Sequence, residues 1–131
     1  MPQDYSDTGH ATGAVRASLQ IEGAAIAVIA CVAFAYTGAS WWLFAALILG
    51  PDLAMIGYLR SPRIGAIAYN LAHTYTAPAG LAAVAIAFDW GAAWPVVCVW
   101  VVHIAADRML GYGLKYARGF KATHLSTGKE V

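Results

Sequence analysis

The stretch that decides the fold is residues 18–37, SLQIEGAAIAVIACVAFAYT, in which Glu22 is the only charged residue. Nearly all of its other residues are apolar or small. A helix of about 20 residues is about 30 Å long, which is the thickness of the hydrocarbon core of a bilayer. Residues 18–37 are therefore predicted to form a helix that crosses a membrane.

Three more apolar runs of similar length follow, at residues 40–59, 64–88 and 91–113. Helix-breaking segments separate them, with Ser61-Pro62 before the third run and Asp89-Trp90-Gly91 before the fourth. Because the connections are short, consecutive helices are expected to be antiparallel neighbours. The pattern predicts an all-α integral membrane protein, a four-helix bundle.

The composition supports a membrane environment. Of the 131 residues, 60% are hydrophobic and 11% are charged, whereas a soluble domain carries roughly 25% charged residues. A chain this short cannot hide that much apolar surface by folding on itself, so we expect membrane lipids to cover part of it. The net charge of +1, without a basic patch interleaved with aromatics, excludes nucleic acid as a partner.

The distribution of cations predicts the topology. All eight Lys and Arg lie before the first run, between the second and third runs, or at the end of the fourth run and beyond. Four successive crossings place these regions on one side, which the positive-inside rule assigns to the cytoplasm. We predict a multi-pass protein of the cell inner membrane, N-in and C-in. Residues 1–15 are predicted to be a mobile polar arm, 16–113 the bundle, and 114–131 a basic, aromatic cytoplasmic tail.

Several ionisable side chains lie inside the predicted spans, where each costs roughly 2.5–3.5 kcal/mol on insertion scales. Five of them matter here: Glu22, Asp52, His73, His103 and Asp107. Counted at about 1.5 Å per residue from the basic residues at the cytoplasmic ends of the spans, all five are expected about 9–18 Å deep, in the cytoplasmic half of the membrane.

Their helical faces agree as well as their depths. His103 and Asp107 are four residues apart and Asn70 and His73 three apart, so each pair shares one side of a helix. If these sides face inward, two imidazoles and at least two carboxylates meet. Such groups are good ligands for Zn²⁺ or another first-row divalent metal.

We therefore predict a divalent metal held by Asp52, His73, His103 and Asp107. Glu22 is predicted to act as the catalytic base or to orient a ligating histidine. A bound metal acidifies water and so makes a nucleophile. The depth suits metal-dependent hydrolysis of a lipid-borne or amphipathic substrate.

Other interpretations remain open, so the sequence does not decide whether the protein is an enzyme. The polar groups alone can hold helices together, with Arg108 forming an ion pair to Asp52 or Glu22. His73 and His103 can instead ligate one haem iron, or the cluster can carry ions or protons. A non-enzymatic subunit that packs against a larger membrane complex is the competing class.

Beyond these residue patterns, the sequence from about 18 to 125 resembles a family of small bacterial membrane proteins, domain of unknown function 4260. The resemblance implies a membrane protein and implies no activity. It rests on LQIEG at 19–23, SWWLF at 40–44, PDLAMIGY at 51–58, YNLAHTY at 69–75, HIAADR at 103–108, GYGLKY at 111–116, Phe120 and THL at 123–125.

A weaker similarity connects Pro51-Asp52 and His73-Thr74 with metal-dependent membrane hydrolases, which carry a Pro-Asp step in one span and a His-rich step in another. This sequence departs from that pattern, since the second acid and the Arg-His pair typical of those hydrolases are missing. The similarity implies a metal-dependent hydrolase.

Overall fold

The structure, a computed structural model, describes residues 13–112, and these residues form helices and short connections without a strand. Most of the predicted arm (1–15) and all of the predicted tail (114–131) lie outside the described residues. The helices are α1 (Gly13–Tyr36), α2 (Trp41–Leu47), α3 (Pro62–Ala72), α4 (Thr76–Ala87) and α5 (Trp94–Met109), with the 3₁₀ helices η1 (Gly50–Leu59) and η2 (Gly91–Ala93).

Three helical segments are long and apolar enough to cross a membrane: Gly13–Tyr36, Trp41–Leu59 and Gly91–Met109. Large apolar side chains also stand exposed along several elements, among them Ile29 on α1 and Leu53 on η1. Water does not favour a surface of this kind, whereas lipid does. The all-helical, membrane-type class predicted from the sequence is confirmed.

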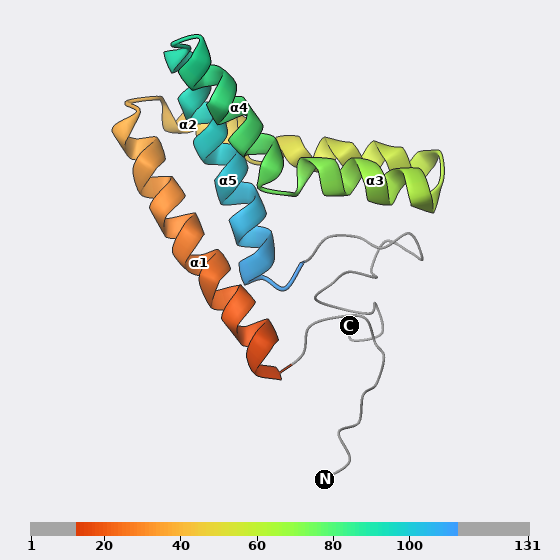
Figure 1. Cartoon of the computed structure of the whole chain (residues 1–131). Helices are drawn as coiled ribbons and strands as arrows, with labels where there is room; N and C mark the ends of the chain where they lie inside the picture. Colours follow the sequence, from red (N-terminus) through yellow and green to blue (C-terminus); the bar gives the residue numbers. More distant parts are fainter. Residues whose placement is uncertain (1–12, 113–131) are drawn as a thin grey trace.

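Helices α1 and α5 lie side by side and antiparallel (Figure 1). Gly23 permits the contact, because a Cβ atom there would lie 2.7 Å from the amide nitrogen of Met109 and 2.8 Å from the carbonyl oxygen of Ala105. Small residues allow such close approach between helices in lipid. The Gln20 amide also donates to the Met109 carbonyl at 3.2 Å. The beginning of α1 therefore meets the end of α5.

An aromatic cluster joins the other end of α1 to α2. Phe34 is fully buried. Its ring centroid lies 4.9 Å from that of Trp41 and 5.2 Å from that of Phe44. The Ser40 side chain caps α2 by accepting from the amide of Trp42. These contacts turn the chain sharply after α1.

Next along the chain, η1 and α3 form a hairpin that runs across the direction of α1 and α5 (Figure 1, η1 in yellow and α3 in green). The Ser61 hydroxyl caps α3 by accepting from the amide of Ile64 at 3.1 Å. The Tyr58 ring lies against Gly65, where an added Cβ would come within 2.2 Å of it. The missing side chain at Gly65 thus allows η1 and α3 to pack closely.

The predicted third span, 64–88, is divided into α3 and α4, so the prediction of one continuous helix there is wrong. His73 leaves the helical conformation, with φ −112° and ψ 15°. Pro78 lacks an amide hydrogen and is tolerated only near the start of a helix. A new helix therefore begins at Thr76, and its 12 residues span about 18 Å, less than a hydrocarbon core.

Candidate metal centre

The break after α3 is held against α5 by two hydrogen bonds. Trp100 Nε1 donates to the carbonyl of Ala72, and Arg108 Nη2 donates to the carbonyl of His73, both at 2.7 Å. The last carbonyls of a helix have no partner within it, and the helix dipole favours a cation at that end. Side chains of α5 therefore fix the position of His73.

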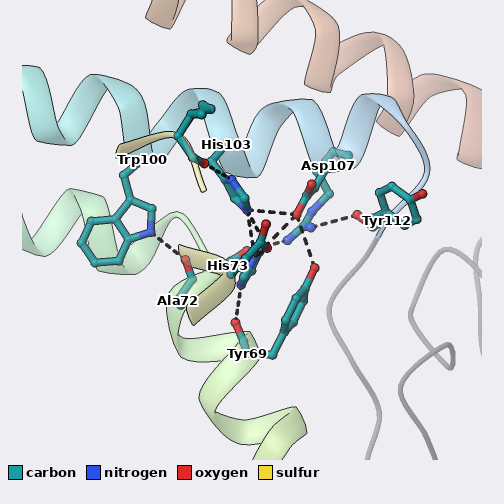
Figure 2. Close-up of polar contacts among 10 residues, drawn as sticks. Tyr69, Ala72, His73, Trp100, His103, Asp107 and Tyr112 are labelled. Atoms are coloured by element: carbon teal, nitrogen blue, oxygen red, sulfur yellow. Dashed lines mark hydrogen bonds and ion pairs between the residues drawn. The ribbon is translucent and has the colours of Figure 1, made fainter. Parts of the chain in front are cut away.

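Four ligand atoms from three parts of the chain converge at this point (Figure 2). Nε2 of His73 and Nε2 of His103 are 3.0 Å apart. Asp52 Oδ1 lies 3.2 Å from each of these nitrogens. Asp107 Oδ2 lies 3.6 Å from the nitrogen of His73 and 3.5 Å from that of His103. One ligand atom from each of the four residues thus lies within 4.8 Å of all the others.

The other ring nitrogens fix the tautomers. Nδ1 of His73 lies 2.8 Å from the carbonyl oxygen of Tyr69, and Nδ1 of His103 contacts the carbonyl oxygen of Ile48. A carbonyl oxygen only accepts, so each Nδ1 must donate. In neutral imidazoles both Nε2 atoms then carry lone pairs directed into the cluster. Backbone carbonyls orient metal-binding histidines in this way.

Tyr69 completes the arrangement around His73 and Asp107. Its ring stacks on the His73 imidazole, with centroids 3.6 Å apart and planes 7° from parallel. Its hydroxyl donates to Asp107 Oδ2 at 3.3 Å (Figure 2). Since Tyr69 is buried, it restricts both ligands to one orientation.

The spacing of the donors fits a small divalent ion. Zn–N and Zn–O bonds of about 2.0–2.1 Å in a tetrahedral site place neighbouring ligand atoms about 3.3–3.4 Å apart. The distances between the nitrogens and from each nitrogen to each carboxylate run from 3.0 to 3.6 Å, and the two carboxylate oxygens lie within 4.8 Å of each other. Two imidazoles and two carboxylates form a donor set that first-row divalent metals accept.

Protons alone do not satisfy both imidazoles. If both Nε2 atoms carried a proton, the two protons would point at each other across 3.0 Å. A divalent ion between them would accept both lone pairs without that cost.

The site opens on the side of Asp52. The side chain of His73 is fully buried and that of His103 is 5% exposed, whereas Asp107 is 18% and Asp52 35% exposed. Asp52 is therefore the ligand most accessible to an incoming molecule.

The predicted convergence of Asp52, His73, His103 and Asp107 is confirmed, and their role as metal ligands stays a prediction. Glu22 is not a member of the group: it lies exposed on α1, and its role as a base also stays a prediction.

Two other polar residues lie near the site. For Arg108 the structural interpretation predicts an ion pair with Asp52 or Glu22. Its guanidinium instead donates to the carbonyls of His73 and Tyr112. Asn70 is half-buried on α3 and does not belong to the group of four.

The sequence places Tyr69 on the same side of its helix as Asn70 and His73, and the structure brings it to the site. Two other supporting groups were not predicted: the indole of Trp100 and the carbonyl of Ile48. A signal for the last was present. In a 3₁₀ pattern the carbonyl of residue 48 accepts from residue 51, and residue 51 is a proline without an amide hydrogen. Pro51 thus leaves the Ile48 carbonyl free for His103.

Comparison with known proteins gives one match. The model of a family described as a domain of unknown function, DUF4260, matches residues 16–127. No curated protein and no solved structure matches the chain.

Proposed function

We propose that this chain, which belongs to the DUF4260 family, is a metal-dependent hydrolase embedded in a membrane. In this proposal His73, His103, Asp107 and Asp52 hold one divalent ion such as Zn²⁺. The observation that supports it is the meeting of four electron-pair donors whose two imidazoles are oriented by backbone carbonyls.

The proposed reaction uses the difference in exposure between the ligands. Catalytic zinc sites keep three protein ligands and leave one position for water. His73, His103 and Asp107, the three less exposed residues, would hold the ion, which would supply acidified water as the nucleophile. Asp52, the most exposed of the four, would act as the base once it no longer holds the ion, and would pass the water's proton to the leaving oxygen of the substrate.

For the topology we propose the arrangement expected from the sequence, with both ends on the cytoplasmic side of an inner membrane. Arg16, near the start of α1, lies beside Gly111, just after α5. The positive charge of Arg16 at this shared end of α1 and α5 favours the cytoplasmic side for that end. His103 is six residues before Met109, so the site lies about 9 Å from that end. Such a depth places the reaction within reach of membrane lipids.

Haem is disfavoured as the alternative cofactor. Two axial histidines must lie on opposite sides of a porphyrin with the iron between them. The Nε2 atoms of His73 and His103 are only 3.0 Å apart, and carboxylates lie where the porphyrin plane would be.

The direct test of the proposal is metal-dependent hydrolysis by the purified protein in detergent, with p-nitrophenyl esters and bis-p-nitrophenyl phosphate as probes. We expect activity that a chelator removes and Zn²⁺ restores, and that Asp52→Asn lowers at least about tenfold. Asp89→Asn, in the turn before η2, is the matched control and should be unaffected.

Hydrolysis that persists under chelation, or that falls equally in both variants, would contradict the proposal. No hydrolysis of any probe, together with no bound metal, would favour the non-enzymatic interpretation.

A further inference from the structure

An apolar hollow lies beside the metal centre. Its volume is about 270 Å³, and its walls are almost entirely apolar. We call it the apolar hollow, and it is lined mainly by Leu47, Gly50, Pro51, Ala72, Val99 and Trp100.

The apolar hollow and the metal centre share their walls. Pro51 directly precedes Asp52, and Ala72 directly precedes His73. Val99 lies one helical turn before His103 on the same side of α5, a rise of about 5–6 Å. A molecule in the apolar hollow therefore lies within about one helical turn of three of the four ligands.

The walls are also fixed in place. The Trp100 indole on α5 donates to the Ala72 carbonyl at the end of α3 at 2.7 Å, so a hydrogen bond connects two of the residues that line the hollow. Pro51 has a restricted backbone, and Val99 is 1% exposed. A preformed apolar site of this kind binds apolar groups without an ordering cost.

We infer that the substrate of the proposed hydrolase is an amphipathic lipid, and that one of its apolar chains occupies the apolar hollow while its polar linkage reaches the metal. This inference rests on the proposed function. The volume lies just below the 300–1,000 Å³ typical of sites for whole drug-sized ligands, so it suits a segment of one chain. The headgroup then lies on the polar, Asp52 side.

The experiment fills the apolar hollow and measures preference for chain length. Gly50 lines it, and a Cβ there would meet nothing within 4 Å, so a Phe ring at this position has room at the wall of the hollow. Gly80, on α4, is equally unobstructed and lies outside the hollow, which makes Gly80→Phe the matched control. The probes are p-nitrophenyl acetate and p-nitrophenyl dodecanoate.

We expect the wild type to prefer the dodecanoate, and Gly50→Phe to lower its kcat/KM at least about tenfold while sparing the acetate. Gly80→Phe should match the wild type on both esters. Metal-dependent cleavage without chain-length preference, or equal effects of the two variants, would overturn the lipid inference and leave the hydrolase standing.

A second readout does not depend on turnover. A fatty acid carrying a terminal diazirine is photolysed with the protein, and the labelled residues are mapped by mass spectrometry. We expect saturable labelling on α5 and η1 beside the apolar hollow, lost in Gly50→Phe and kept in Gly80→Phe. Labelling spread evenly over the lipid-facing surface, unaffected by excess unlabelled fatty acid, would refute the inference even if no ester is cleaved.

Discussion

Replacing Gly23 by Ala tests the close packing of α1 on α5. The added Cβ would lie 2.7 Å from Met109 N, 2.8 Å from Ala105 O and 2.9 Å from Arg108 Cβ, whereas ordinary contact begins at 3.4 Å. Two of these atoms belong to the backbone and cannot rotate away. The helices must therefore separate by about 0.5–0.7 Å, a gap at which packed atoms lose a quarter to a half of their attraction.

Two effects of opposite sign decide how much Gly23→Ala changes the free energy of unfolding. Overpacking typically costs about 1–3 kcal/mol, while Ala is favoured over Gly in a helix by about 0.8–1.0 kcal/mol. Gly80→Ala provides the control, because that position is also inside a helix and a Cβ there meets nothing within 4 Å. The helix-propensity gain cancels in the difference between the two variants, which isolates the packing cost.

The assay is equilibrium unfolding of the purified protein in mixed micelles. We expect Gly23→Ala to be about 1–3 kcal/mol less stable than Gly80→Ala. Because Arg108 holds the carbonyl of His73, Gly23→Ala should also weaken metal binding. Equal stability of the two variants would refute the close contact between α1 and α5.

Three further predictions address the support of the site and the topology. Trp100→Phe removes the hydrogen bond to Ala72 and should destabilise the protein by about 1–2 kcal/mol in the same unfolding assay, whereas Trp42→Phe, at an exposed position, should change little; equal losses would contradict this role of the indole. Tyr69→Phe removes a donor to a ligating carboxylate and should weaken Zn²⁺ affinity about 10–100-fold in a chelator competition titration, and unchanged affinity would show that the hydroxyl is not needed. A reporter fused after Val131 should be active only in the cytoplasm, and periplasmic activity would reverse the proposed orientation.

Part of the site could be predicted because helical geometry is regular. The i, i+4 spacing of His103 and Asp107 gives one face of α5, and depth counted from the flanking cations gives a common level. These two rules sufficed to place Asp52 and His73 near them, as the structure confirms. Glu22 satisfied the depth rule as well, but the structure leaves it outside the group. Depth alone does not fix the direction in which a side chain points.

The break at His73 could not be predicted from hydropathy, because residues 64–88 read as one apolar run. The break depends on tertiary hydrogen bonds. Trp100 and Arg108 donate to the carbonyls of Ala72 and His73, which a continuous helix would pair internally. Such partners lie about 30 residues away in the chain, so local sequence rules do not find them. Pro78 was the one local sign that a helix begins nearby.

The central claim, a divalent metal at the four converging ligands, is tested most directly by loading the metal-depleted protein with Co²⁺ and recording its visible spectrum. We expect one Co²⁺ per chain with the intense absorption of a tetrahedral site, displaced by one equivalent of Zn²⁺. We expect that absorption to be lost in His103→Ala and retained in Asp89→Asn. Weak octahedral absorption with no saturation at one equivalent, unchanged by His103→Ala, would contradict the metal centre.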